Sequence, residues 1–105
     1  MSYDSGISTL LTLYQRTAIF HALKVQARGN IDLLSRLQYT TTNEGIVRVG
    51  FLEKEIQDIT EVLEIMLKKS EDVGADHFGQ LSLIELKDLL RKFEGLSNVF
   101  QKKGA

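Results

Sequence analysis

The sequence predicts an all-α protein, a small helical bundle of three to four helices that forms a single domain over residues 1–105. Proline is absent, so no residue fixes φ or removes an amide donor inside a helix. Apolar residues also recur every three or four positions over most of the chain, which is the spacing of one helix face. The segment 39–49 departs from this pattern, and there we expect either a short β-ribbon or a loop.

The composition is that of an ordinary globular protein, with 43% hydrophobic and 26% charged residues. The lack of cysteine excludes disulfides, thiolate metal sites and a thiol nucleophile. The net charge of −1 argues against a nucleic-acid partner, because phosphate contacts need a surplus of basic residues. The sequence shows no basic signal segment and no long apolar run. We therefore expect a cytoplasmic protein that has no membrane partner.

The first helix is expected to begin at Asp4 or Ser5, because either side chain can cap the first turn. Apolar residues after this point fall on two stripes of the helix rather than one. A helix that is apolar on two sides must be covered on both, by neighbouring elements or by a second copy of the chain. One stripe comprises Ile7, Leu10, Leu11, Tyr14, Ala18, Ala22 and Val25, and the other comprises Leu13, Phe20, Leu23 and Ala27.

A helix break is expected at Gly29–Asn30, since glycine favours a left-handed helix end and asparagine can cap the next helix. The alternative is one long helix that tolerates the glycine. After the break, the spacing of Ile31, Leu34 and Leu37 predicts a short helix that runs to about Gln38.

Residues 39–49 support two interpretations. As a ribbon, the runs 39–42 and 46–49 are rich in β-branched and aromatic residues and flank a turn that contains Asn43 and Gly45. As a helix start, Thr41 and Glu44 have the spacing of a capping box. We favour a loop or a short ribbon that leads into a helix.

The strongest periodic signal lies in residues 49–66, where six apolar residues step alternately by three and four positions, as in the a/d seam of a heptad repeat. The pattern spans only about three heptads, so a bundle helix is favoured over a free-standing coiled coil. A last helix is expected from Ser82, with an interruption near Gly95. The six seam residues are Val49, Leu52, Ile56, Ile59, Leu63 and Met66.

The polar link before the last helix, GADHFGQLSLIE at 74–85, has part of the spacing of a calcium-binding loop. With Glu85 at position 12, Gly79 falls at the sharp turn and Ser82 falls at position 9. These residues resemble the EF-hand family. The segment LSLIELKDLL resembles the end of the longer first loop of S100 proteins, with that loop counted over 72–85.

The resemblance implies a helical regulator, but two ligand positions depart from the EF-hand pattern. Gly74 at position 1 and Phe78 at position 5 supply no side-chain oxygen. We therefore expect a degenerate, calcium-free segment at 72–85. Ser82 and Glu85, which stand three apart, are expected to form a capping box at the start of the last helix.

The sequence predicts no catalytic, cofactor-binding or metal-ligating residue. His21 has no histidine or acidic residue four positions away, and it is expected to be a partly buried, hydrogen-bonded core residue. His77 is expected to be exposed. No phosphate-binding glycine loop or nucleophile motif occurs. Arg36 and Arg48 could touch phosphates if 39–49 formed a wing, but they lie near many acidic residues and make a poor nucleic-acid footprint.

These observations favour a non-enzymatic protein–protein interaction module that associates with itself, of the helical dimer, adaptor, chaperone or inhibitor type. One alternative is that the same apolar residues form a single intramolecular core. Another is an EF-hand-like helical regulator with a degenerate loop at 72–85. The candidate interface comprises Leu13, Phe20 and Leu23 on the first helix and Leu52, Ile56, Ile59 and Leu63 on the heptad seam.

Overall fold

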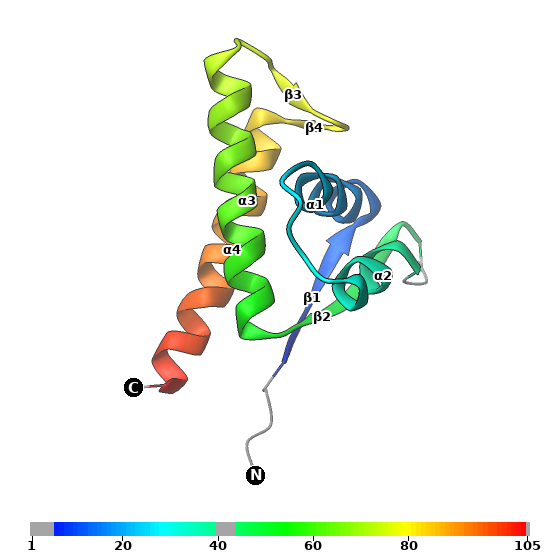
Figure 1. Cartoon of the computed structure of the whole chain (residues 1–105), viewed down its shortest axis with the longest axis vertical. Coiled ribbons are helices and arrows are strands. Elements are labelled where there is room, and N and C mark those ends of the chain that lie inside the picture. The colour runs from blue at the N-terminus through cyan, green and yellow to red at the C-terminus, as the bar shows by residue number, and fades with distance from the viewer. Residues whose placement is uncertain (1–5, 40–43, 105) are drawn as a thin grey trace.

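The computed structural model describes residues 6–39 and 44–104, which are mostly helical and which also form a two-stranded ribbon and a short hairpin (Figure 1). The prediction of a mostly helical bundle with a short β element is confirmed in outline, and the described residues contain more β structure than the expected ribbon at 39–49. In chain order the elements are β1 (Ile7–Thr12), α1 (Leu13–Val25), α2 (Ile31–Tyr39), β2 (Ile46–Phe51), α3 (Glu53–Asp72), β3 (His77–Phe78), β4 (Leu81–Ser82) and α4 (Leu83–Gly104).

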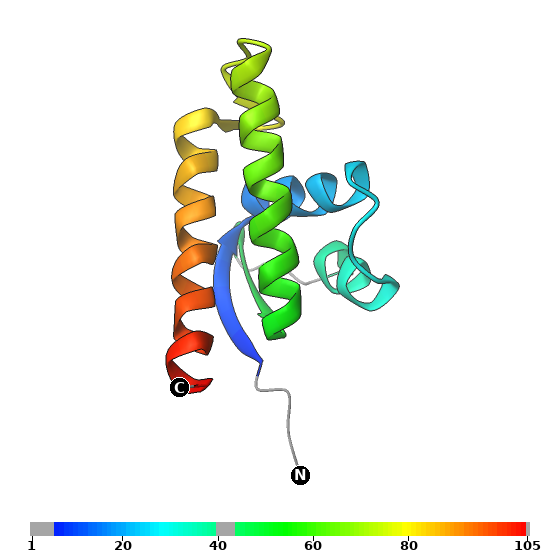
Figure 2. The ribbon, with the colours of Figure 1, turned by 60° about the vertical axis from the view of Figure 1, so that its left-hand side comes forward.

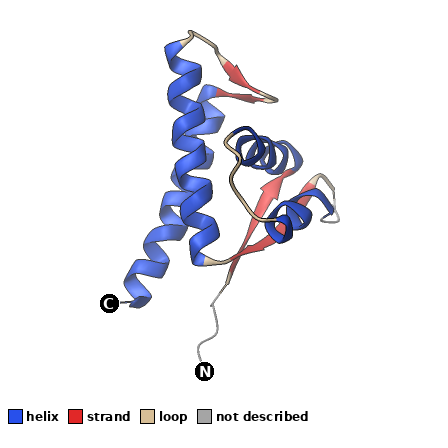
Figure 3. Cartoon of the chain, in the orientation of Figure 1, coloured by secondary structure: helices blue, strands red, loops and turns tan. Residues whose placement is uncertain are grey.

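The main correction concerns the N-terminal segment, which is strand β1 rather than the first half of a helix. It pairs antiparallel with β2 (Figure 3). The register places Ile7 opposite Phe51 and Thr12 opposite Ile46. Apolar residues at 7, 10, 11 and 14 match a helix face, but a strand that finds a β-rich partner satisfies its backbone equally well. The partner lies far along the chain, so local spacing could not reveal it.

Helix α1 begins at Leu13 because Thr12 caps it. The backbone N–H of Gln15 donates to Thr12 Oγ1 over 3.1 Å, and the N–H of Thr12 donates to Gln15 Oε1 over 2.9 Å. This reciprocal pair is a capping box. It replaces the caps predicted at Asp4 or Ser5, which lie outside the described residues.

The break at Gly29–Asn30 is confirmed. Gly29 has a φ of +85°, a left-handed conformation that glycine adopts without strain. Asn30 Oδ1 accepts the N–H of Leu33 over 2.8 Å and so caps α2. The short second helix therefore exists as predicted, and it ends at Tyr39.

The ribbon predicted within 39–49 is half right. Strand β2 covers 46–51, but its partner is β1, and Tyr39 belongs to α2. Residues 40–43, which include Thr41 of the alternative capping box, lie outside the described residues.

Helices α3 and α4 pack side by side along most of their length (Figures 1 and 2). The last four seam residues, Ile56, Ile59, Leu63 and Met66, lie on α3 and are buried. Val49 is instead in β2, and Leu52 precedes the first residue of α3, so the helical seam begins at Ile56, about two turns later than predicted. Gly95 lies within α4 and does not interrupt it.

The core lies where the inner face of the ribbon meets the helices. Phe51 of β2 and Phe93 of α4 are each 1% exposed or less, and their rings meet edge to face with centroids 5.5 Å apart. Such a pair contributes about 0.5–1.5 kcal/mol beyond the burial of the two rings. The same core includes Leu11 from β1, Leu23 from α1 and Ile59 from α3. The aromatic pair thus joins the ribbon to the α3–α4 pair.

We predict that Phe93→Ala lowers the free energy of unfolding by about 3–5 kcal/mol, because it leaves a cavity against Phe51. Urea unfolding followed by circular dichroism measures the change. The matched control is Ile84→Ala on the same helix, where the side chain is 73% exposed and a change within about 0.5 kcal/mol is expected. Equal losses in the two variants would contradict this account of the core.

Candidate interaction surface

The outer face of the ribbon is open to solvent along both strands. Strand alternation turns Leu11, Val47, Val49 and Phe51 into the core, so the intervening residues point outward. Leu10 is 48% exposed and Ile46 is 46% exposed. In this register Leu10 lies opposite Arg48 and Ile46 lies opposite Thr12, so the two apolar side chains are diagonal neighbours. The outward residues are Ser8, Leu10, Thr12, Ile46, Arg48 and Gly50.

A cleft adjoins this face at Thr12, where β1 turns into α1. Its volume is about 270 Å³, and it lies between the start of α1 and the start of α4. Tyr14 stands in it with 57% of its surface exposed. The lining residues are Thr12, Tyr14, Gln15, Leu81, Glu85 and Asp88. We call the outer ribbon face together with this cleft the ribbon surface.

The cleft side of the ribbon surface is acidic. The N–H of Ser82 donates to Glu85 Oε1 over 2.9 Å, and this bond and a further one from the Ser82 side chain hold the pKa of Glu85 below its usual value. Asp88 is 3.9 Å from Arg91, a distance at which an exposed pair interacts weakly. Arg48 supplies positive charge on the ribbon side, where its guanidinium is 3.3 Å from Ser8 Oγ. The surface thus carries both signs of charge at separate places.

Side chains occupy three main-chain groups of the ribbon. Lys92 Nζ donates to the carbonyl of Leu10, and Arg36 Nη1 donates to the carbonyl of Gly50 over 2.7 Å. The N–H of Thr12 is bound by Gln15. Unpaired strand groups invite another strand to add at the sheet edge, and occupied ones do not. The open face is therefore a better place for contact than the strand edges.

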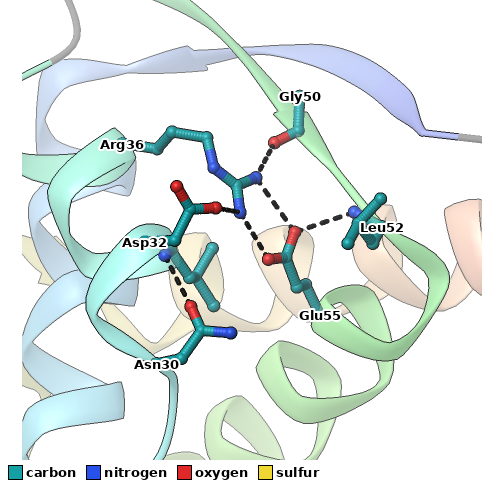
Figure 4. Close-up of polar contacts among 7 residues, drawn as sticks. Asn30, Asp32, Arg36, Gly50, Leu52 and Glu55 are labelled. Atoms are coloured by element: carbon teal, nitrogen blue, oxygen red, sulfur yellow. Dashed lines mark hydrogen bonds and ion pairs between the residues drawn. The ribbon is translucent and has the colours of Figure 1, made fainter. Parts of the chain in front are cut away.

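An ion pair between the half-buried Arg36 and the buried Glu55 joins α2, β2 and α3 (Figure 4). Arg36 donates to both carboxylate oxygens of Glu55, over 2.9 Å to Oε1, and it also bonds Asp32 over 2.7 Å. Glu55 is only 6% exposed, and its Oε1 accepts the N–H of Leu52 over 2.8 Å. The bonds to Glu55 are the main reason that the pKa of Arg36 is raised. Because these bonds connect three elements of the fold, we interpret the ion pair as structural rather than as a binding site.

A second arginine ties the α1–α2 link to α3. Arg28 Nη2 lies 2.6 Å from Asp58 Oδ1 and 2.6 Å from Glu61 Oε2. Hydrogen bonds to Glu61 and then to Asp58 raise the pKa of Arg28. These two carboxylates of α3 thus share one cation from the same chain.

The predicted interface residues divide into buried and accessible ones. Leu23, Ile56, Ile59 and Leu63 have no exposed surface and belong to one core, so a partner cannot reach them in the folded chain. For these four the intramolecular alternative describes the structure.

Three predicted interface residues remain accessible. Leu13 is half-buried, and Phe20 packs against the core with Lys24 Nζ 5.5 Å from its ring centre. Leu52 is 37% exposed. A role for these three in an interface stays a prediction. The apolar spacing around Leu10 also fits a helix, so it does not reveal the ribbon face, whereas the alternation of IVRV at 46–49 indicates a half-exposed strand.

The predicted capping box at 82–85 is confirmed. The N–H of Glu85 donates to Ser82 Oγ over 3.2 Å, which complements the bond from the Ser82 N–H to Glu85. Before it, β3 and β4 form a tight hairpin in which Gly79 has a φ of +62°, as the first central residue of a type II′ turn requires. In the described part of the chain, no group of three or more His, Asp or Glu residues could hold a metal ion.

The two histidines lie near this hairpin. His77 is exposed as predicted and bonds Asp76 over 2.9 Å, a contact that lowers the pKa of Asp76. His21 is also exposed, which corrects the expected core position. Its ring lies against the buried Phe78, with centroids 5.6 Å apart, because α1 faces the hairpin at this point.

A scan against protein-family models, a search of curated proteins and a search of solved structures found no significant match to this chain. Across residues 6–39 and 44–104, no helix has the length and apolar character needed to cross a membrane.

We predict that the stability difference between the wild type and Glu85→Gln narrows in acid. Glutamine can keep the cap but not the charge. Because the pKa of Glu85 is lowered in the fold, the contribution of its carboxylate is present above the usual pKa of 4.5 and is lost as the pH falls through the lowered one. Urea midpoints at pH 7 and in strong acid measure this, with Glu94→Gln on the same helix as the control. A difference that does not change with pH would contradict it.

Proposed function

We propose that this chain is a non-enzymatic protein–protein interaction module that associates with a second copy of itself through the ribbon surface. The observation that supports this most is the open sheet face, where Leu10 and Ile46 are each about half exposed beside a cleft that holds Tyr14. Tyrosine and apolar side chains are enriched at the centres of interfaces. The proposal involves no catalytic residue, cofactor, nucleic acid or membrane, and it keeps the cytoplasmic location expected from the sequence.

Charge favours a second copy as the partner. A two-fold contact brings the same patch of both subunits together, so that patch must complement itself. The ribbon surface has Arg48 on the ribbon side and Glu85 and Asp88 on the cleft side. A copy turned about a two-fold axis can direct its Arg48 toward the carboxylates of the other and vice versa, while Leu10 and Ile46 meet their equivalents. Such complementary charges fix the register of a contact more than they strengthen it.

The size of the surface sets the expected strength. Two strands of six residues offer a face of roughly 20 Å by 10 Å. A standard interface buries about 800 Å² on each partner, so the ribbon face needs the cleft and the flank of α4 to approach that area. We therefore expect a weak dimer in exchange with the monomer.

We predict that the mass measured by light scattering rises from 11.9 kDa toward twice that value as the concentration increases through the micromolar range. Leu10→Lys should hold the mass at the monomer value, because it places an unpaired charge in the contact. Ile31→Lys is the matched control, since Ile31 is 83% exposed on α2 and outside the ribbon surface.

A charge exchange tests the geometry of this dimer. Arg48→Glu should weaken the dimer, and Arg48→Glu with Asp88→Lys should restore it. A wild-type mass that stays at 11.9 kDa at every concentration would refute self-association. If Leu10→Lys leaves the dimer intact, the two copies associate through a surface other than the ribbon surface.

The EF-hand-like regulator remains the alternative, and the engagement of Glu85 in the helix cap argues against it. We predict that titration with calcium gives no saturable heat in calorimetry and no change in tyrosine fluorescence. A saturable signal that Glu85→Gln abolishes would favour the alternative instead.

A further inference from the structure

Helix α2 is too short to be stable by itself. It has nine residues, whereas an isolated helix in water is marginal below about 12–15 residues. Its stability must come from docking, in which Leu33 and Leu37 become buried, with exposures of 1% and 0%. The outward side of α2 carries Ile31 and Asp32, both exposed.

Left-handed residues flank α2 on both sides. Ala27 and Gly29 before it have φ values of +53° and +85°, and Glu44 and Gly45 after it have values of +57° and +80°. All four lie outside the helices and strands. The N–H of Ala27 donates to the carbonyl of Lys24 over 3.1 Å, and the carbonyl of Gly45 accepts the N–H of Leu13 over 3.0 Å, so these two positions are bonded to α1. Glycine takes both signs of φ at little cost. A change of chain direction at Gly29, or about φ of Gly45 with its carbonyl held in place, need not disturb α1 or β2.

Arg36 ties α2 to the rest of the fold. Its side chain is 32% exposed, and from α2 it bonds the carbonyl of Gly50 in β2 and the carboxylate of Glu55 in α3. The Glu55 side chain is 7% exposed. Removing the arginine would leave a buried carboxylate without its cation, which is strongly unfavourable.

We propose that α2 is a hinged flap that opens and closes on the fold as one unit, and that the Arg36–Glu55 ion pair is its latch. Opening uncovers Leu33 and Leu37 together with the parts of α1 and β2 that α2 packs against. The Phe51–Phe93 contact between the ribbon and α4 stays in place. The flap is a device separate from the ribbon surface and does not depend on self-association.

Amide hydrogen exchange on the full wild-type chain tests the flap. The amides of α2 should exchange faster than those of α3 and α4. The free energy of this opening should depend only slightly on the urea concentration, because opening α2 exposes little surface. The flap is refuted if the slowest α2 amides follow the same urea dependence as the slowest α4 amides. That result would mean that α2 opens only with the whole protein.

Variants test the latch. Arg36→Met should speed exchange in α2 by at least about 100-fold, and exchange in α4 by much less. Asp32→Asn is the matched control, because it removes an 80% exposed partner of the same arginine and should change α2 exchange by less than about threefold. If Arg36→Met does not fold, Glu55→Gln serves in its place, since the amide can still accept the Leu52 N–H.

Two outcomes would overturn the latch. One is an equal acceleration of α2 and α4, which would make the ion pair a tie of the whole fold. The other is an Asp32→Asn variant that opens α2 as readily as Arg36→Met or Glu55→Gln does.

Discussion

The pairing of β1 with β2 is the constraint on which the rest of the structure depends. The two strands precede and follow α1 and α2 in the chain, so both helices lie in the connection between β1 and β2. A two-stranded ribbon is marginal alone and needs a surface to pack against. The α3–α4 pair and α1 provide that surface, and Phe51 against Phe93 makes the closest aromatic contact. Ribbon and helices are therefore stable only together.

The sequence predicts those features of the fold that neighbouring residues determine, and it misses those that depend on residues far apart in the chain. Local signals gave the break at Gly29–Asn30, the buried face of α3 from Ile56 onward, and the capping box at Ser82 and Glu85, because each is decided within one or two helical turns. The strand at 7–12 could not be found in this way. Its apolar spacing fits a helix as well as a strand. Pairing with β2 decides for the strand, and β2 lies too far along the chain to affect the local spacing. Because residues 7–12 were expected to be helical, Leu10 was not expected on an exposed sheet face.

Buried charge has a different role here from buried apolar surface. Leu23, Ile59 and Leu63 pack in one core whose contacts are many and interchangeable. The Arg36–Glu55 pair has a single geometry, and it fixes where α2 lies relative to β2 and α3. Charged pairs are poor sources of net stability but good determinants of position. The spacing of charges along the sequence gave no sign of this pair, since its members come from separate elements.

The side chains that bind the ribbon's main-chain groups have a practical consequence for shortened versions of the chain. Lys92, which holds the carbonyl of Leu10, comes from α4, the last element of the fold. A fragment that stops before α4 would lose this lysine together with Phe93, leaving a β-branched and leucine-rich strand with a bare edge. Such edges serve as templates for fibrils. Truncation from the C-terminal side is thus a route to aggregation, and shortened forms of the chain that retain α4 are the ones that should stay in solution.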